Sequence, residues 1–284
     1  MLTVLEAINK STDFLEKKGI ESARTNAELL LASILKCKRL DLYLRFDRPL
    51  DESEITDYRE YIRRRSLFEP LQYITGSVEF FGLELKVTQG ILIPRPETEL
   101  LVEAVIEEIK NKNEVSILDI GTGSGAISIS LAYKLINAKI TACDISEKAL
   151  FVANENAAKY NLDERINFVH YDILKNDIQN PGKFDVIVSN PPYVSDDEYK
   201  NLQKEIRDYE PAEAVTDFGD GFKFYSIITE KSNSLLKSGG MLFFELEASS
   251  NEKVEKILSD NNFINIKKIK DYSGFERIIF GIKK

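Results

Sequence analysis

Apolar and polar residues follow two different periods along this chain, and the change between them suggests its domains. In residues 1–69 apolar positions recur at helical spacing, as from Leu2 to Leu15, and Gly19 follows as a suitable helix end. Three more helices are predicted there, at about 22–35, 40–44 and 51–69. Because this region shows no constellation of catalytic side chains, we expect residues 1–69 to form a helical domain that recognises another molecule rather than reacting with it.

The remainder of the chain shows a different pattern. In residues 70–92, Gly76, Gly82 and Gly90 interrupt a short apolar run, which predicts a β-hairpin linker. Pro96 is well placed to start the helix that follows. Strand-like and helical runs then alternate, and the predicted strands are 115–120, 139–143, 166–170, 184–189, 241–245, 263–269 and 277–282.

Such alternation is typical of a parallel sheet whose strands are joined by right-handed crossover helices. The last two predicted strands are separated by only a short loop, so we expect them to close the sheet as an antiparallel pair. Residues 93–284 are therefore predicted to form one α/β domain with a Rossmann-like sheet of seven strands.

Composition and charge narrow the possible functions. No apolar run approaches the roughly 20 residues that cross a bilayer, and the N-terminus lacks the apolar core of a signal peptide, so we expect a cytoplasmic protein without a membrane partner. The net charge of −9 argues against a direct nucleic-acid substrate, because phosphate binding requires a basic surface. Arg63, Arg64 and Arg65 are interpreted as the solvated end of a helix. Two distant cysteines and a single histidine, His170, predict no metal site.

The run Asn190-Pro191-Pro192-Tyr193 directly follows the predicted strand 184–189. The prolines fix their own φ angles and donate no hydrogen bond, and Asn190 is kept out of the helical region by the proline after it. The Asn190 side-chain oxygen and the Pro191 carbonyl can then serve as two fixed acceptors beside the Tyr193 ring. This arrangement suits a planar, neutral NH2 group, although two prolines are also a common strand end.

A glycine-rich turn, Gly121-Thr122-Gly123-Ser124-Gly125, joins the predicted strand 115–120 to a helix. Glycines let a ligand approach the backbone closely, and a helix N-terminus offers free N–H groups. The spacing fits the dinucleotide fingerprint, and Asp144 follows about 20 residues later, at the end of the next strand. These residues predict a nucleotide site, and an NAD-dependent oxidoreductase is one alternative that they allow.

The charge near this turn distinguishes between nucleotides. Asp119 would repel a pyrophosphate but favours an ammonium or sulfonium group, which predicts S-adenosylmethionine as the cofactor and S-adenosylhomocysteine as its product. Asp144 is expected to bind the ribose hydroxyls. Asp172 is expected either to accept from the adenine amino group, with Ile173 against the ring, or to cap a turn. With Asn190, four strand ends then meet at one crevice.

Three segments together resemble the peptide chain release factor N5-glutamine methyltransferases: Asp119–Gly125, Asn190–Tyr193 and Ile93–Glu99. The resemblance extends to residues 70–76, 80–83, 210–211, 220–221 and 271–277. The Asn-Pro-Pro-Tyr run is shared with adenine-N6 and cytosine-N4 DNA methyltransferases, so the segment Ile93–Glu99 is what indicates the glutamine-modifying branch. The segment Leu246–Ser250 departs from the family, whose members often carry glycine and then glutamine after the equivalent of Glu245.

The resemblance implies methylation of the side-chain amide nitrogen (N5) of the glutamine in the Gly-Gly-Gln loop of release factors. It also implies that the helical domain of residues 1–69 helps to dock this substrate protein. The catalytic residues would be Asn190, Pro191 and Tyr193, with the first two accepting both N–H groups of the amide and the Tyr193 ring stacked on it. Pro192 and Arg95 would join them in substrate binding, unless Arg95 forms only a surface ion pair. No general base is needed, because the methylated amide is acidic enough to lose its proton afterwards.

Other functions share parts of this pattern. A nucleic-acid base methyltransferase would use the same clamp but needs a basic groove and base flipping. An inactive scaffold would bind a translation factor through residues 1–69 without using Asp144 or Asn190. The nearest alternative is the same chemistry on another glutamine, such as one on a ribosomal protein.

Overall fold

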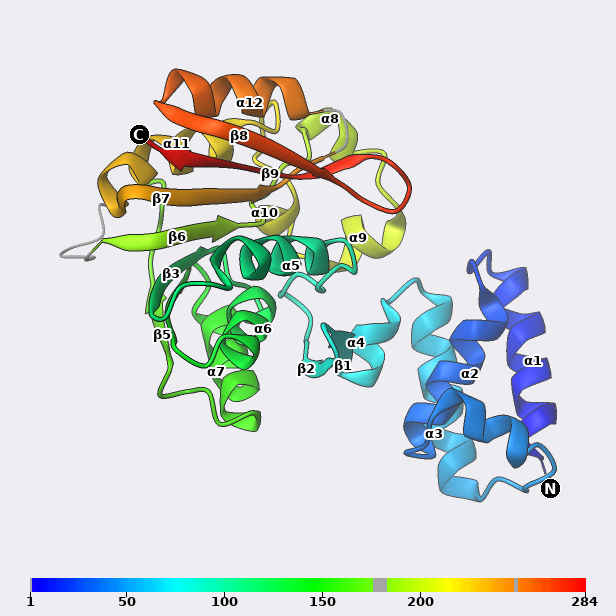
Figure 1. Ribbon diagram of the computed structural model, residues 1–284. Helices are drawn as coiled ribbons and strands as arrows, with labels where there is room; N and C mark the ends of the chain where they lie inside the picture. The colour runs from blue at the N-terminus through cyan, green and yellow to red at the C-terminus, as the bar shows by residue number, and fades with distance from the viewer. Residues whose placement is uncertain (1, 176–182, 248–249) are drawn as a thin grey trace. The chain divides into compact units, whose positions relative to one another are not determined.

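The computed structural model describes residues 2–175, 183–247 and 250–284. The chain divides into two compact units: Met1–Ser77 with Gln203–Tyr209, and Val78–Leu202 with Glu210–Lys284. Figure 1 labels their helices and strands. Among the described residues, no helix is long and apolar enough to span a bilayer.

The first unit is helical, as the spacing of apolar residues predicts. Thr3 and Asp51 each cap a helix, because the side chain accepts a hydrogen bond from the backbone N–H three residues later. The side chains of Glu6 and Glu54 in turn accept from the backbone N–H of the cap residue. The core of this unit includes Leu15, Leu30 and Leu31. The elements are α1 (Val4–Lys17), α2 (Ala23–Ile34), the 3₁₀ helix η1 (Arg39–Leu44), α3 (Glu52–Ser66), α4 (Leu71–Thr75) and α9 (Lys204–Tyr209).

The interpretation of the three arginines of α3 as a solvated helix end is wrong for Arg65. Its side chain is buried, donates to the Asn26 side-chain oxygen at 2.7 Å and to the Glu69 carbonyl at 3.0 Å, and forms an ion pair with Glu205. The reason is the helical period: Arg65 follows Tyr58 and Ile62 at intervals of four and three residues, and these residues form the buried face of α3.

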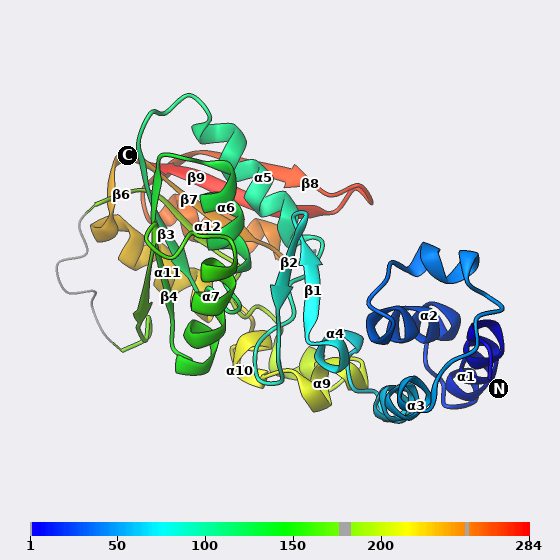
Figure 2. The ribbon, with the colours of Figure 1, turned by 90° about the horizontal axis from the view of Figure 1, so that it is seen from below.

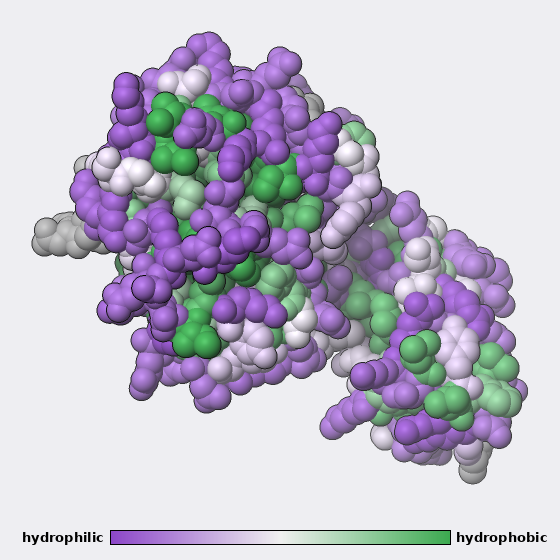
Figure 3. All heavy atoms as spheres, viewed as in Figure 1, coloured by the Kyte–Doolittle hydropathy of each residue, from purple (hydrophilic) through white to green (hydrophobic). Residues whose placement is uncertain are grey.

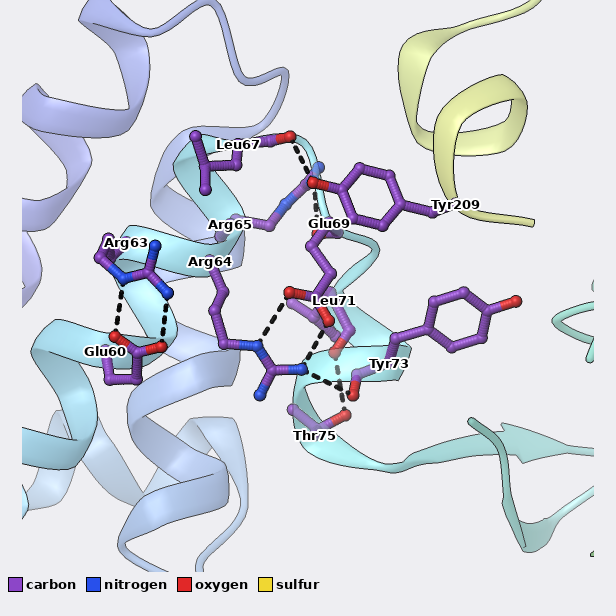
Figure 4. Close-up of polar contacts among 10 residues, drawn as sticks. All are labelled: Glu60, Arg63, Arg64, Arg65, Leu67, Glu69, Leu71, Tyr73, Thr75 and Tyr209. Carbon is purple, nitrogen blue, oxygen red and sulfur yellow. Dashed lines mark hydrogen bonds and ion pairs between the residues drawn. The ribbon is translucent and has the colours of Figure 1, made fainter. Parts of the chain in front are cut away.

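The two neighbouring arginines differ from Arg65. Arg63 pairs with Glu60 on the exposed side of α3. Arg64 donates to Glu69 at 2.5 and 2.8 Å and to the Tyr73 carbonyl at 3.3 Å (Figure 4). The three consecutive arginine side chains thus lie in different surroundings: Arg63 in solvent, Arg64 against the start of α4 and Arg65 in the core.

Helix α9 belongs to the helical unit although it comes much later in the chain. Glu205 lies 140 residues after its partner Arg65. The Tyr209 hydroxyl donates to the Leu67 carbonyl at 2.8 Å (Figure 4). The sequence pattern does not indicate this return of the chain.

The predicted hairpin is shorter than the segment assigned to it. Strands β1 (Ser77–Phe80) and β2 (Leu83–Lys86) pair as a two-stranded sheet (Figure 2), whereas Leu71–Thr75 forms α4. That helix begins after Pro70 and ends at Gly76, whose φ of 79° lies in the left-handed region that glycine favours. The Lys86 N–H of β2 donates to the Asn156 side chain at 2.7 Å, which fastens the hairpin to α7.

The second unit contains the predicted sheet of seven strands, in the order β5-β4-β3-β6-β7-β9-β8. Strands β5, β4, β3, β6 and β7 are parallel, and β9 runs antiparallel to both β7 and β8. The strands are β3 (Val115–Ile120), β4 (Ala138–Asp144), β5 (Ile166–His170), β6 (Phe184–Ser189), β7 (Leu236–Glu245), β8 (Phe263–Lys270) and β9 (Glu276–Lys283).

Helices cover both faces of this sheet (Figure 1). Consecutive strand residues point to opposite faces, so Ile117 packs with one cluster of buried residues and Leu118 with the other. The first cluster includes α5 (Thr98–Ile109), α6 (Ala126–Lys134) and α7 (Glu147–Lys159), and the second includes α11 (Lys223–Leu235) and α12 (Asn251–Asp260). Three short helices, α8 (Asp196–Tyr199), α9 and α10 (Ala212–Val215), lie between β6 and α11 in sequence.

The order of the strands determines where a ligand can bind. The chain passes from β3 to β4 on one side, and β6 pairs with β3 on the other side. In open α/β sheets such a reversal leaves a crevice at the carboxyl ends of the strands. The turn after β3 and the segment after β6 border that crevice.

Candidate active site

A cavity of about 530 Å³ lies at the carboxyl ends of β3, β4 and β6. Its volume is within the range of small-molecule sites in proteins. Most of the predicted site residues line it, and three of them, Asp119, Gly125 and Tyr193, do not. The predicted residues on its wall are Arg95, Gly121, Thr122, Gly123, Ser124, Asp144, Asp172, Ile173, Asn190, Pro191 and Pro192.

The glycine turn is fastened to the end of β4. The Gly121 N–H donates to the Cys143 carbonyl at 2.9 Å, and the Gly123 N–H donates to Asp144 Oδ2 at 2.8 Å. Asp144 Oδ1 accepts a further bond from the Ser146 N–H at 2.9 Å. Burial raises the pKa of Asp144, while these bonds from the backbone act against that rise. A carboxylate offers about four acceptor positions, so Asp144 can brace the turn and still accept bonds from ligand hydroxyls.

Asp119 supports the turn from below rather than lining the cavity. Its Oδ2 accepts from the Thr122 hydroxyl at 2.7 Å and from the Ser128 hydroxyl. Among residues 2–175, 183–247 and 250–284, its Oδ1 finds no hydrogen-bond partner. Complete burial raises the pKa of Asp119 to about 6. A buried carboxyl group with one unused acceptor gives this end of the site a demand for a donor or a cation.

Gly125 has a packing role. An ideal Cβ at this position would lie 2.8 Å from Ile129 Cδ1 and 3.2 Å from the Ala153 Cβ, and the residue has a φ of +83°. A side chain would therefore require the Ile129 side chain and the contact with Ala153 of α7 to shift, in addition to the strain of the positive φ.

Asp172 and Ile173 follow β5. Asp172 Oδ1 accepts from the Leu174 N–H at 2.9 Å, and its other oxygen lies 3.2 Å from Lys175 Nζ. The turn-capping alternative is therefore present, and because Asp172 also lines the cavity, the two expected roles are compatible. Ile173 is buried on the cavity wall.

Asn190 is held in a definite orientation at the end of β6. Its Nδ2 donates to the Thr98 hydroxyl oxygen at 3.1 Å. This bond uses one of the two N–H groups of the amide and turns its side-chain oxygen away from Thr98, so that the oxygen can accept from a ligand. Immediately before it, the Ser189 hydroxyl donates to the Ile120 carbonyl at 2.7 Å and ties the ends of β6 and β3 together.

Two residues that the sequence reasoning missed complete this arrangement. The Thr98 hydroxyl donates to Glu245 Oε2 at 2.6 Å, and the Tyr193 hydroxyl donates to Glu245 Oε1 at 3.2 Å. Burial raises the pKa of Glu245 to about 7 and the pKa of Tyr193 well above its usual value. A carboxylate at the end of the apolar run 241–245 is the signal that could have drawn attention to this strand.

Tyr193 therefore lies with its hydroxyl on a buried carboxyl group and is not among the residues on the cavity wall. The stacking of its ring on a target amide stays a prediction. Of the segment Leu246–Ser250, residues 248 and 249 lie outside the described residues. Leu246 is buried, and its N–H donates to the Arg277 carbonyl at 2.6 Å.

Arg95 forms an ion pair, which is one of the two roles expected for it, but the pair is partly buried rather than on the surface. Its Nη2 lies 2.5 Å from Glu210 Oε1, and Glu210 itself is buried. The other oxygen of Glu210 accepts from the Ile93 N–H at 3.4 Å. This pair joins the segment Ile93–Glu99 to the loop that precedes α10, and both border the cavity.

Comparison with protein families divides the chain in a similar way. A family model described as the PrmC N-terminal domain matches residues 6–76. A second model, described as the methyltransferase small domain, matches residues 96–209.

Curated relatives are similar over nearly the whole chain. A release factor glutamine methyltransferase from Fusobacterium nucleatum is 41% identical over 98% of this chain and 78% of its own length. Proteins of the same description from Chlorobaculum tepidum and Clostridium acetobutylicum are 40% and 35% identical. The alignment with the Chlorobaculum tepidum protein covers 97% of this chain and 95% of that protein. The alignment with the Clostridium acetobutylicum protein covers 99% of both chains.

Solved structures share the fold of the second unit. A ribosomal protein L11 methylase from Lactobacillus delbrueckii has a TM-score of 0.51 and 24% identity, covering 70% of this chain and 85% of its own. A 16S rRNA methyltransferase from T. Thermophilus, solved with AdoMet and guanosine, has a TM-score of 0.53 and 18% identity, covering 73% and 50%. At these identities the likeness concerns the fold alone.

Proposed function

The chain belongs to the release factor glutamine methyltransferases, and we propose that it methylates the N5 side-chain nitrogen of the glutamine in the Gly-Gly-Gln loop of these factors. It is a methyltransferase, and S-adenosylmethionine is the methyl donor that we propose for it. The observation that supports the proposal is the orientation of Asn190 on the cavity wall, where its nitrogen donates to Thr98 and its side-chain oxygen is turned away from that bond.

The residues around the cavity fit S-adenosylmethionine. When bound, this cofactor supplies an electrophilic methyl group on a positively charged sulfur. Asp144 would bind the ribose hydroxyls, and Ile173 and Asp172 would hold the adenine ring and its amino group. The glycine turn lets the ligand approach the backbone. Asp119 lies buried behind this turn, and the negative charge of its carboxylate favours the positively charged end of the cofactor without touching it. The same carboxylates disfavour the pyrophosphate of NAD.

The amide of the substrate needs help from the protein because its nitrogen lone pair is delocalised into the carbonyl. The Asn190 oxygen and the Pro191 carbonyl accept its two N–H bonds and direct the lone pair towards the methyl group. As the nitrogen pyramidalises and becomes positive, both bonds strengthen, so the site stabilises the transition state more than the ground state. After transfer, the alkylated nitrogen loses its proton to water.

The helical unit is proposed to dock the release factor in the cytoplasm. Figure 3 shows hydrophobic residues scattered among hydrophilic ones on the visible face of this unit. Large apolar side chains are exposed in and just after η1, namely Leu40, Tyr43, Leu44 and Phe46. Such a group of exposed side chains is typical of a surface that binds another protein.

The test is to incubate the purified enzyme with a release factor and labelled S-adenosylmethionine, and to map the label by mass spectrometry of peptides. We expect one methyl group on the glutamine of the Gly-Gly-Gln loop and none on a release factor in which that glutamine is replaced. Transfer to DNA, to rRNA or to a glutamine of a ribosomal protein instead would contradict the proposal.

A further inference from the structure

A chain of two hydrogen bonds, the first partly buried and the second buried, runs from the proposed substrate-binding amide to a carboxyl group. It passes from Asn190 Nδ2 at the end of β6 to the Thr98 hydroxyl at the start of α5, at 3.1 Å. From there it continues to Glu245 Oε2 at the end of β7, at 2.6 Å. Thr98 and Glu245 are only 4% and 2% exposed, so water does not replace these bonds easily.

The chemistry of the three groups gives this chain one direction. An amide nitrogen donates hydrogen bonds and does not accept them, so Thr98 must accept from Asn190. The single hydroxyl hydrogen of Thr98 is then directed at Glu245, and Oε2 must be an acceptor. The carboxylate form of Glu245 meets that requirement and polarises both bonds.

We propose that Thr98 and Glu245 are positioning residues that keep the oxygen of Asn190, rather than its NH2 group, turned towards the substrate amide. The two ends of an asparagine side chain have nearly the same size, so packing alone does not choose between them. A reversed Asn190 would present donors to the N–H groups of the substrate. This inference rests on the proposed function, in which Asn190 accepts a bond from the target glutamine.

Protonation of Glu245 disturbs this arrangement in either of two ways. A proton on Oε2 is donated to the Thr98 hydroxyl oxygen. The hydroxyl hydrogen of Thr98 then points towards Asn190, which must turn its side-chain oxygen to Thr98 in order to accept it. A proton on Oε1 leaves the direction unchanged but removes the charge that polarises the chain. Both forms hold the Asn190 oxygen less firmly towards the substrate.

The groups that face Glu245 come from several elements. Glu97, just before α5, raises its pKa, whereas Arg277 of β9 and the bonds from Thr98 and Tyr193 lower it. Tyr225 of α11 donates to the Glu245 backbone carbonyl at 2.8 Å. Burial is the largest influence, and it brings the pKa to about 7. Protonation therefore occurs in the range where kcat can be measured.

The first test compares three substitutions of buried threonines. Thr98→Val removes the link, and we expect kcat to fall about tenfold, as for one ordinary hydrogen bond, with the affinity for S-adenosylmethionine unchanged. Thr98→Ser keeps the hydroxyl and should restore kcat to within about threefold of the wild type. Thr229→Val is the matched control, because among the described residues the buried Thr229 hydroxyl has no hydrogen-bond partner.

The second test uses pH. The wild-type kcat should fall as pH decreases through about 7, and this step should be absent in Glu245→Gln, which cannot change its charge. The Gln side chain can still accept from Thr98 through its oxygen, so this variant also carries the test if Thr98→Val does not fold. Persistence of the step in Glu245→Gln, or a Thr98→Val enzyme within threefold of wild type, would overturn the proposal.

A third measurement does not depend on catalysis. In protein labelled with ¹⁵N-asparagine, the side-chain NH2 signal of Asn190, identified from Asn190→Ala, should shift with pH near 7. That shift should disappear in Glu245→Gln, and its survival there would contradict the inference. If these signals behave as expected while the wild type leaves the release factor unmethylated, the orientation stands and the proposed function fails.

Discussion

At the residue scale, the side chains at the ends of β4 and β6, the two strands that flank β3, make different contacts in this site. Asp144 is the last residue of β4 and braces the glycine turn, whereas Asn190 follows β6 and is proposed to face the substrate amide. The positions of both residues could be predicted from the sequence, because each lies at a strand end and belongs to a short recognisable motif. The hydrogen bonds of Thr98 and Glu245 could not be predicted, because they join residues that lie far apart in the sequence.

Asn190→Ala is expected to lower kcat by about 10²–10³, as for the loss of one oriented polar group in a preorganised site, while the affinity for S-adenosylmethionine stays the same. Steady-state kinetics and calorimetry provide the two measurements. Asn201→Ala, at an exposed position outside the cavity, is the control. An Asn190→Ala enzyme within threefold of the wild type would show that the amide is held by other groups.

Asp144→Asn should act on binding instead. Losing the charge removes charge-assisted bonds to the ribose, each about 1.5–3 kcal/mol, so the Kd for S-adenosylmethionine should rise roughly 10- to 150-fold. Calorimetry measures this directly, with the exposed substitution Asp260→Asn as the control. An unchanged Kd would remove Asp144 from the cofactor site.

Glu245 should also leave a signature in stability. Its native pKa of about 7 lies above the ordinary 4.5, so the native state binds this proton more tightly than the unfolded state. The resulting stabilisation is fully present below about pH 4.5 and is lost as pH rises through about 7. The Tm of the wild type should therefore decrease across this window relative to Glu245→Gln in calorimetric scans. A constant difference between the two Tm values would contradict the raised pKa.

At the scale of elements, the sheet was predictable and the connections were less so. Parallel strands covered on both faces read as continuous apolar runs, and β3 and β6 begin and end where the sequence places them. β7 begins at Leu236, five residues before the predicted start, because Lys237, Ser238, Gly239 and Gly240 interrupt its apolar pattern. Helix α4 was missed because it is too short to show a helical period.

The loop before α11 packs closely on the segment after β6. Gly221 has a φ of +83°, and a Cβ there would lie 2.4 Å from the Tyr193 carbonyl oxygen. Gly221→Ala should therefore lower the free energy of unfolding by about 1–3 kcal/mol and also reduce kcat, since the Tyr193 backbone must move. Gly239→Ala, with a φ of +73° and no neighbour within 4 Å, provides the backbone strain without the clash. Equal effects of the two changes in urea unfolding would contradict the close contact.

At the scale of the whole molecule, the helical unit is built from two distant parts of the chain. No local pattern predicts this, because the decisive contacts join Arg65 to Glu205 and Leu67 to Tyr209. The cavity, in contrast, is formed entirely by residues of the second unit.

Arg65→Leu should lower the free energy of unfolding by about 1–3 kcal/mol, because Glu205 and Asn26 lose a buried partner. Arg63→Leu is the matched control on the same helix, where the pair with Glu60 is exposed and little change is expected. Urea unfolding gives the energies, and faster proteolytic cleavage within 203–209 should accompany the Arg65 change. Similar results for both variants would mean that α9 is not held by Arg65.

The late return of α9 has a consequence for biosynthesis. A ribosome that adds about 5–20 residues per second needs roughly 7–28 s to proceed from Arg65 to Glu205, 140 residues later. Throughout that interval the nascent helices carry a guanidinium group whose carboxylate has not yet been translated. The N-terminal helices are thus made first, yet they reach their final packing only after most of the second unit has left the ribosome.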